Sequence, residues 1–334
     1  MNDSRDNSNA EITGLNKEGR KGYDRRDFLK CLGAWAGTGV VLATVGGVLT
    51  SCKLEDPVPG VLSFMQISDT HIGFGKDPNP KPVETLQSLV DKINAMPQRP
   101  PFVIHTGDLT HLSKPEEFDT LDQILRGVKT DQIFYVPGEH DVFSDQGREF
   151  LGRFGKGTKG AGWQSFDRNG THYVGLNNVV AARSGAAPGT FNNGGGEGLG
   201  SLGGEQLEWL RNDLAALSTS TPVVVFTHVP LWSVYPQWGW GTEDSEQALS
   251  LLRRFGSVTV LNGHIHQVMQ KVEGNITFHT ARSTAYPQPE PGTAPSPGPI
   301  KDLPAGRLGQ TIGVTQVRYI ENDKPLAIID TALG

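Results

Sequence analysis

Asp, Glu and His side chains recur at short spacings in this sequence, each time directly after an apolar run of strand length. The first group, Asp69-x-His71, places a carboxylate and an imidazole two residues apart, so that both point the same way along an extended segment. Such a pair suits a transition-metal ion. One pair arises easily by chance, but four further groups follow it: Gly107-Asp108, Gly138-Glu139-His140-Asp141, His228 and Gly263-His264-x-His266.

The apolar runs before these groups predict buried strands, and the segments between them predict amphipathic helices. The order of strands and helices over residues 61–136 predicts a sheet with parallel pairs and helical crossovers. Polar residues that follow such strands meet at the carboxyl edge, where ligands bind in open α/β sheets. We predict strands at Val61–Gln66, Phe102–Thr106, Ile133–Val136, Val223–Phe226 and Val258–Leu261, and helices at Pro80–Met96, Pro115–Leu125, Glu205–Leu217 and Ser245–Phe255.

The remaining segments predict a hairpin, further strands and two long loops. Asn169-Gly170 between Trp163–Asp167 and His172–Asn178 is a typical hairpin turn. The Gly-rich stretch Ser184–Gly204 predicts a mobile loop over the site, and the Pro-rich stretch Pro287–Pro299 predicts a second loop. Three further strands are predicted at Asn275–Thr280, Thr311–Ile320 and Ala327–Asp330.

Taken in order, these groups strongly resemble the pattern of the calcineurin-like metallophosphoesterases: D-x-H, G-D, G-N-H-D/E, H and G-H-x-H. The resemblance covers residues 61–334. It implies a four-layer α/β/β/α sandwich of two mixed sheets, with a dinuclear metal site at one sheet edge. By position, one metal would be bound by Asp69, His71, Asp108 and His266, and the other by Asp108, Glu139, His228 and His264, with Asp108 as the bridge.

The chemistry of these side chains agrees with that assignment. Seven Asp, Glu and His groups at one edge would repel each other and be poorly solvated without cations. Their mixed nitrogen and oxygen atoms favour two divalent or mixed-valence ions of Fe, Mn or Zn. Two such ions can hold an oxyanion and create a hydroxide that attacks a phosphate mono- or diester. The resemblance makes His140 a catalytic residue that reaches the substrate, and Asp141 the group that orients it.

The sequence departs from the family pattern at two positions. Glu139 replaces the usual Asn ligand and adds a negative charge. His111 stands where the purple acid phosphatases have a metal-binding Tyr, so no ferric–tyrosinate centre is expected. His111 can be a surface residue, a partner of Glu139 behind the metals, or an extra ligand.

Other polar and aromatic residues are given less specific interpretations. Trp232, Tyr235, Trp238 and Trp240 can pack within their loop or line a substrate pocket. Arg183 and Arg282 can contact phosphate, although single arginines usually lie in solvated ion pairs. His105 and His279 are predicted to be core residues with satisfied hydrogen bonds, and His172 is predicted to be a surface strand residue.

The first 52 residues predict an export signal. Arg25-Arg26 before Phe28-Leu29-Lys30 resembles a twin-arginine motif, and the uncharged, Gly-rich run 31–50 resembles a signal h-region. The run ends in Leu49-Thr-Ser-Cys52, which resembles a lipobox, so Cys52 is a candidate for lipidation; ordinary cleavage nearby is the alternative. We therefore expect export by the twin-arginine machinery, with the protein either free in the periplasm or anchored to the membrane, facing the periplasm, through a lipid on Cys52.

Charge and motif content exclude other functions. Residues 53–334 contain 23 Lys and Arg against 30 Asp and Glu, a net charge of −7, which disfavours nucleic acid as a partner. The sequence lacks the His-x-His-x-Asp-His cluster of a metallo-β-lactamase-like hydrolase. A non-catalytic metal-binding or interaction module on the same fold remains the alternative to a phosphoesterase with a small phosphate-ester substrate.

Overall fold

The strands form two mixed sheets. The computed structural model describes residues 41–45, 48–52, 61–179, 199–319 and 326–334. The first sheet has the order β2-β1-β13-β12-β3-β4-β5 and the second the order β10-β11-β9-β8-β7-β6. The first sheet comprises β1 (Val41–Val45), β2 (Val48–Cys52), β3 (Val61–Ile67), β4 (Val103–His105), β5 (Ile133–Tyr135), β12 (Gly313–Tyr319) and β13 (Leu326–Ala332). The second comprises β6 (Gln164–Arg168), β7 (Thr171–Gly175), β8 (Val223–Phe226), β9 (Val258–Asn262), β10 (Met269–Glu273) and β11 (Ile276–Thr280).

Parallel pairs lie at the centre of both sheets. Strands β3, β4 and β5 are parallel neighbours, whereas β12 runs antiparallel to β3. In the second sheet β7, β8, β9 and β11 are parallel, and β6 and β10 are antiparallel edge strands. The strands that precede the Asp and His groups are therefore parallel within each sheet, and their carboxyl ends lie at one edge.

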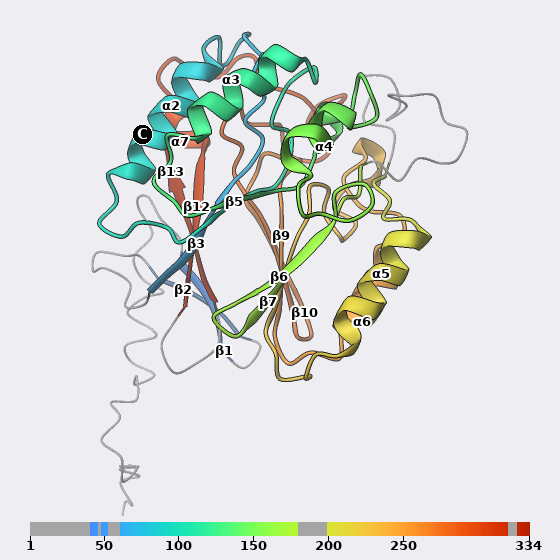
Figure 1. The fold of residues 1–334 in the computed structure, drawn as a ribbon. Helices are drawn as coiled ribbons and strands as arrows, with labels where there is room; N and C mark the ends of the chain where they lie inside the picture. The colour runs from blue at the N-terminus through green and yellow to red at the C-terminus, as the bar shows by residue number, and fades with distance from the viewer. Residues whose placement is uncertain (1–40, 46–47, 53–60, 180–198, 320–325) are drawn as a thin grey trace, which may run out of the picture. The chain divides into compact units, whose positions relative to one another are not determined.

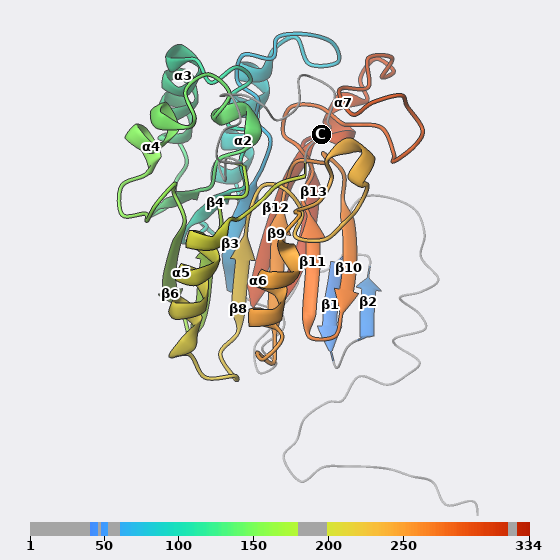
Figure 2. The ribbon, with the colours of Figure 1, turned by 90° about the vertical axis from the view of Figure 1, so that its right-hand side faces the viewer.

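Helices cover the outer faces of both sheets, which gives the predicted four-layer α/β/β/α sandwich. Helices α2 (Pro82–Asn94) and α3 (Pro115–Leu125) lie against the first sheet, and α5 (Gly204–Ala215) and α6 (Ser245–Leu252) lie against the second (Figure 1). Turning the molecule by 90° brings α5 and α6 in front of the strands that they cover (Figure 2).

Strand periodicity explains the layers. Val223 and Val225 on β8 pack with the leucines of α5 and α6, whereas Val224 and Phe226 pack between the sheets with Phe64 of β3. Met65 and Ile67 of β3 pack under α2 and α3 on the other side. Because successive side chains on a strand point to opposite faces, each central strand contributes to two apolar layers.

Most predicted elements are present with small shifts of their ends. Asn169 and Gly170 have φ of 51° and 74°, which suits the tight turn between β6 and β7. Strand β10 and the helices α4 (Arg148–Phe154) and α7 (Leu308–Thr311) are elements that the sequence analysis did not predict. Most of the predicted loop Ser184–Gly204 lies outside the described residues, as does Arg183.

The segment assigned to an export signal is described only in part. Arg25-Arg26 lie outside the described residues, whereas β1 and β2 form an antiparallel hairpin, and β1 pairs with β13. No helix among the described residues is long and apolar enough to cross a membrane.

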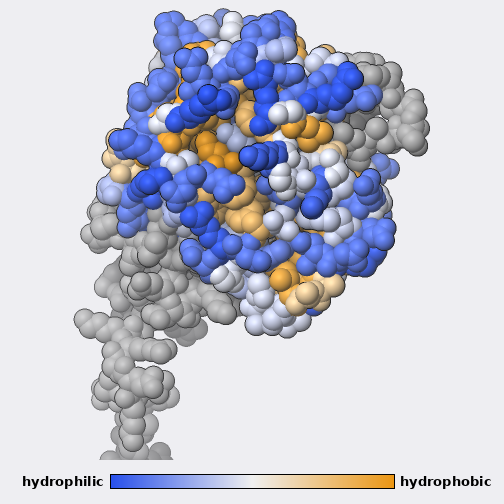
Figure 3. Space-filling view, viewed as in Figure 1, coloured by the Kyte–Doolittle hydropathy of each residue, from blue (hydrophilic) through white to orange (hydrophobic). Residues whose placement is uncertain are grey.

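The face drawn in Figure 3 is largely hydrophilic over α2 and α3, with hydrophobic residues visible in several patches.

Candidate metal centre

The loops that follow the central strands bring the seven predicted ligands together in an unusual backbone conformation. Five of them have φ between 40° and 70°, whereas among the other described non-glycine residues only three have a positive φ. This left-handed region is disfavoured for side chains with a Cβ atom, and it is found most often where function requires it. The five residues are Asp69, His71, Asp108, His264 and His266.

The first ligand group consists of Asp69, His71, Asp108 and His266, all buried, with one candidate ligand atom of each within 4.8 Å of the others. The Nε2 atoms of His71 and His266 lie 3.2 Å apart. His71 Nε2 lies 3.4 Å from Asp108 Oδ2, and His266 Nε2 lies 3.3 Å from Asp69 Oδ1. Four donor atoms therefore converge on one point, as the resemblance implied.

The second group consists of Glu139, His228 and His264. Glu139 lies on the short 3-10 helix η1 (Glu139–Asp141). Its Oε2 is 2.9 Å from His228 Nε2, and its Oε1 is 2.9 Å from His264 Nδ1. Glu139 thus points into the site. Asp108 Oδ2 is 3.4 Å from His228 Nε2, the same distance as from His71 Nε2, so this oxygen lies between the two groups.

Buried polar atoms without hydrogen-bond partners show that the site fits metal ions. Asp69 Oδ2, His228 Nε2, Glu139 Oε2 and both ring nitrogens of His264 are buried and have no hydrogen bond. His228 Nε2 and Glu139 Oε2 lie within ion-pair distance but lack hydrogen-bond geometry. Leaving such atoms unsatisfied is costly, whereas nitrogen and carboxylate oxygen are good ligands for transition metals.

Outer hydrogen bonds fix the orientation of the ligands. His228 Nδ1 donates to the carbonyl of Thr106 and His266 Nδ1 to the carbonyl of Tyr286, both at 2.7 Å. Since a carbonyl only accepts, the Nε2 atoms carry the free lone pairs and face the site. The main-chain N–H of His264 donates to Asp69 Oδ1 at 3.0 Å.

Two glycines of the motifs leave room for the carboxylates. A Cβ atom on Gly138 would collide with Asp108 Oδ1, and one on Gly263 would lie 2.5 Å from Asp69 Oδ2. Any larger residue at either position would displace a ligand. A glycine directly before each of these ligands, Glu139 and His264, is therefore a packing requirement of the site.

Burial and mutual charge shift the pKa values of the ligands. Burial acts to raise the pKa of Asp69, but His266 and His228 outweigh it and lower that pKa to about 2. Burial is outweighed in the same way at Glu139, where His264 and His228 hold the pKa well below its ordinary value. Burial and the neighbouring His140 lower the pKa of His71 far below its ordinary value. These carboxylates and this imidazole are therefore in their metal-binding forms.

The structure corrects the role given to Asp141. Its carboxylate accepts hydrogen bonds from the main-chain N–H groups of Leu109, Thr110 and Gly138 and from the Thr110 hydroxyl, at 2.9–3.0 Å. Burial and the Asp108 carboxylate raise the pKa of Asp141 to about 7, although these N–H groups oppose the shift. Asp141 therefore joins two ligand-bearing loops rather than holding the ring of His140.

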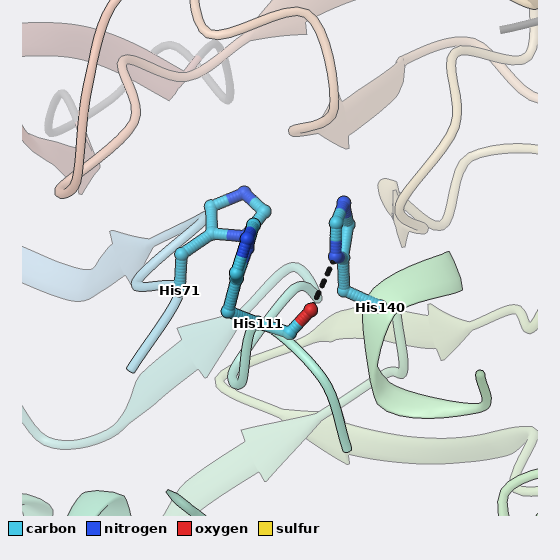
Figure 4. A group of neighbouring side chains, drawn as sticks. All are labelled: His71, His111 and His140. Carbon is cyan, nitrogen blue, oxygen red and sulfur yellow. Dashed lines mark hydrogen bonds between the residues drawn. The ribbon is translucent and has the colours of Figure 1, made fainter. Parts of the chain in front are cut away.

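The ring of His140 is held instead by its neighbour His111. His140 Nδ1 donates to the carbonyl oxygen of His111 at 2.7 Å, drawn as a dashed line in Figure 4. The two rings are stacked, with centroids 5.0 Å apart and planes at 16°. Burial acts to lower the pKa of His140, but Asp108 and Glu139 outweigh it and raise that pKa.

His111 lies beside the ligand groups and is half-buried, so its surroundings favour an inward role over that of a surface residue. Its ring also contacts His71 edge-on, with centroids 5.5 Å apart, and its Nδ1 is buried without a hydrogen bond. Burial and His140 lower the pKa of His111 to about 4, so its imidazole is neutral at neutral pH. His71, His111 and His140 form a further group whose nitrogen atoms lie within 4.8 Å (Figure 4).

Tyr286 is a site residue that sequence reasoning missed. Its hydroxyl lies 3.3 Å from His71 Nε2, its ring stacks on His71 with centroids 4.9 Å apart, and its carbonyl holds His266. It stands next to the predicted Pro-rich loop, and its only signal in the sequence was an aromatic residue near prolines.

The loop 232–240, which carries the Trp and Tyr residues, serves mainly for packing. Trp238 and Trp240 are buried against Ile265, the residue between His264 and His266 in the sequence.

His105, His279 and Arg282 lie outside the ligand groups. His105 is buried, and its Nε2 lies 3.1 Å from the Thr70 hydroxyl; His279 is buried 3.2 Å from Asp330. Both are core residues, as predicted. Arg282 donates to the carbonyls of Gln310 and Thr311.

The prediction that His172 is a surface residue is wrong. Only 4% of His172 is exposed, because α5 covers it. Its Nδ1 lies 2.8 Å from Asp167 and its Nε2 2.9 Å from Asp213 on that helix.

Comparison with solved structures supports the fold. A dimetal phosphatase from Danio rerio matches with a TM-score of 0.58 at 15% identity, covering 82% of this chain and 97% of that one. A purple acid phosphatase from yellow lupin seeds matches with a TM-score of 0.53 at 13% identity, covering 84% of this chain and 54% of that one. At this level of identity, the likeness shows a shared architecture.

Sequence comparison adds two relatives. A probable cyclic nucleotide phosphodiesterase of Rhodopseudomonas palustris is 26% identical over 67% of this chain and 79% of its own length. A glycerophosphodiester phosphodiesterase of Enterobacter lignolyticus is 23% identical over 60% of this chain and 68% of its own length. The family model described as calcineurin-like phosphoesterase matches residues 62–268, which span every predicted ligand. The chain thus belongs to the calcineurin-like phosphoesterase family and is a hydrolase of phosphoric ester bonds, as the order of its Asp and His groups predicted.

Proposed function

We propose that this protein is a dinuclear metallophosphodiesterase that hydrolyses monoanionic phosphodiesters in preference to phosphate monoesters. The observation that carries this proposal is the position of Asp108 Oδ2, which lies 3.4 Å from a histidine nitrogen of each ligand group. One carboxylate oxygen shared by two sets of buried ligand atoms is the arrangement that a pair of ions needs.

The chain offers a complete set of ligands for such a pair. One ion would be held by Asp69, His71, Asp108 and His266, and the other by Asp108, Glu139, His228 and His264. Nitrogen and oxygen atoms in this ratio favour Fe, Mn or Zn. When bound, these ions supply Lewis acidity toward a phosphoryl oxygen and make a hydroxide nucleophile available near neutral pH.

The preference for diesters follows from Glu139. Asp69, Asp108 and Glu139 contribute three negative charges, so that two divalent ions leave the site with a net charge of about +1. An Asn at position 139 would leave about +2. A lower positive charge attracts a dianionic monoester less, whereas a diester carries only one charge. The names of the two bacterial relatives, both phosphodiesterases, support the same preference.

His140 is the residue best placed to act on the leaving oxygen. Its Nδ1 is engaged by the His111 carbonyl, which leaves Nε2 as the free nitrogen. Its main-chain N–H donates to Asp108 Oδ1, so the position of the ring is tied to the shared ligand. We infer that Nε2 donates a proton or a hydrogen bond to the departing alkoxide.

The test is hydrolysis of bis(p-nitrophenyl) phosphate and of p-nitrophenyl phosphate by protein loaded separately with Fe, Mn or Zn. We expect a higher kcat/KM for the diester and about two metal ions per chain. A metal-loaded protein that hydrolyses neither ester would refute the proposal. A higher kcat/KM for the monoester would refute the stated preference alone.

We further propose that the protein is exported by the twin-arginine machinery and anchored in the periplasm through Cys52. The support comes from the sequence of residues 1–52, because the structure does not describe Arg25-Arg26. Replacing Arg25-Arg26 by Lys-Lys should retain the precursor in the cytoplasm, which fractionation would show. The intact mass of the membrane-extracted protein tests the anchor, and an unmodified terminus would rule it out.

A further inference from the structure

Several exposed hydrophobic residues stand beside residues of the metal centre in the sequence. The described residues have five large hydrophobic side chains that are markedly exposed, and three of them follow a site residue by one or two positions. Leu112 follows His111 and is 40% exposed, Phe143 follows Asp141 by two positions and is 50% exposed, and Val268 follows His266 by two. A single exposed hydrophobic residue is ordinary, but several beside one site suggest an apolar ligand.

Leu112 and Phe143 stand on two loop segments that are bonded together. Ser113 Oγ and Ser144 Oγ are joined by a 2.7 Å hydrogen bond, and the Ser144 main-chain N–H donates to Ser113 Oγ at 2.9 Å. These serines directly follow Leu112 and Phe143.

The same two segments begin with the stacked rings of His111 and His140. The His140 ring is in addition bonded to the His111 carbonyl. The apolar side chains and the catalytic imidazole are therefore held in a fixed relation by contacts at both ends of the paired segments.

We propose that Leu112 and Phe143, together with the ring of His111, form the subsite for the leaving group, and that the preferred substrates are phosphodiesters of an apolar, ring-bearing alcohol. The inference rests on the proposed function, because it places the leaving oxygen at His140 Nε2. The ring of His111 stacks on that imidazole, and Leu112 and Phe143 follow the two histidines on the paired segments 111–113 and 140–144, so we place the substituent of that oxygen against them. Covering Leu112 and Phe143 removes apolar surface from water, which favours aryl groups over charged groups of similar size.

The experiment compares esters that differ only in the leaving group. Methyl 2-naphthyl phosphate and methyl 4-sulfophenyl phosphate release aryl alcohols of comparable acidity, but only the first is apolar. The ratio of their kcat/KM values is measured for the wild type and for Leu112→Ser/Phe143→Ser. We expect the ratio to fall about tenfold in the double variant, because contact with the naphthyl ring is lost.

Val83→Ser is the matched control. Val83 is 43% exposed on α2 and also hydrophobic, but it has no site residue beside it in the sequence. This variant should keep the wild-type ratio. A ratio that is equal in the wild type and in the Leu112→Ser/Phe143→Ser variant would overturn the subsite and leave the proposed function intact.

A binding measurement separates the subsite from catalysis. The monomethyl ester of 2-naphthylmethylphosphonate cannot lose its carbon substituent, and its binding to the metal-loaded protein is compared with that of monomethyl methylphosphonate. We expect the wild type to bind the naphthyl compound about tenfold more tightly than monomethyl methylphosphonate. The double variant should bind the two compounds with equal affinity. Equal binding by the wild type would overturn the subsite even if no ester were hydrolysed.

Thermal unfolding distinguishes a substrate from another part of the chain as the occupant. If only the substrate covers Leu112 and Phe143, both serine substitutions should change the Tm as little as Val83→Ser does. A fall of many degrees in the double variant alone would mean that the protein itself covers these side chains, and would overturn the proposal.

Discussion

The main-chain N–H of His140 donates a 3.0 Å hydrogen bond to Oδ1 of Asp108. This bond occupies one oxygen of the carboxylate and turns the other toward the ligand histidines on both sides. It also makes the position of the catalytic imidazole depend on the residue that both metals would share.

Asp108→Asn tests the bridge without disturbing the loop. The amide oxygen can still accept the His140 N–H, but the second oxygen becomes an NH₂ group with no lone pair for a metal. We expect bound metal to fall from about two ions to about one per chain and turnover to fall below detection. Metal analysis and an activity assay check this outcome, with exposed Asp302→Asn as the control. Wild-type metal content in Asp108→Asn would contradict a shared ligand.

His140→Ala should separate catalysis from metal binding. The ring contributes no atom to the two ligand groups, so the metal content should not change. We expect turnover to fall by about 10²–10⁴-fold with a poor leaving group. The loss should be smaller with p-nitrophenyl esters, because their leaving group needs no proton. A variant that loses metal would instead make His140 a ligand.

Glu139→Asn changes the charge of the site while keeping an oxygen ligand. Glu139 lies 2.9 Å from both His228 and His264, so its loss should weaken retention of the second metal. The added positive charge should raise the rate with a monoester relative to a diester. Both effects are measured in one series, by dialysis against a chelator and by the ratio of the two kcat/KM values. If neither the metal retention nor the ratio of the kcat/KM values changes, the charge at position 139 affects neither metal binding nor the choice of substrate.

Asp213→Asn should destabilise the fold in a pH-dependent way. Burial acts to lower the pKa of His172, but Asp213 and Asp167 outweigh it and raise that pKa above its ordinary value near 6.5. Below that value the histidine is charged in the folded and unfolded chain alike, and the ion pairs contribute fully. As the pH rises through the higher folded pKa, the proton is lost and the contribution disappears.

The measurement is the free energy of unfolding in urea at pH 6 and pH 9. We expect the cost of Asp213→Asn to be larger at pH 6 by about 1–2 kcal/mol. The hydrogen bond from Ser165 to Asp213 is present at both pH values and largely cancels in the comparison. An equal cost at both pH values would contradict the claim that Asp213 raises the pKa of His172.

The ligand-bearing half of the fold could be predicted because its signals are local. The runs before Asp69 and Asp108 are apolar and short, and a parallel sheet necessarily places their ends at one edge. Helix α3 begins at Pro115 and ends at Leu125, as its proline and its apolar spacing predicted. By contrast, β10 has half-exposed residues with no clear alternation, so nothing in its sequence distinguished it from a loop.

The details of the site depended on contacts that sequence spacing does not contain. His172 looks like a surface residue on a polar hairpin, but Asp213, 41 positions later, covers it. Tyr286 meets His71 from 215 positions away. Asp141 follows His140 directly, yet its carboxylate turns back to the N–H groups of Leu109 and Thr110, because these groups would otherwise be buried without an acceptor.

The left-handed backbone at five ligands has a consequence for how this protein can change over generations. Glycine at position 71, 108 or 264 would relax the local conformation, and would also delete a donor atom. Selection for stability alone would therefore favour losing these side chains, so only selection for activity keeps them. In descendants that are no longer selected for catalysis, we expect these positions to be substituted first, while Phe64 and Val224 between the sheets stay apolar.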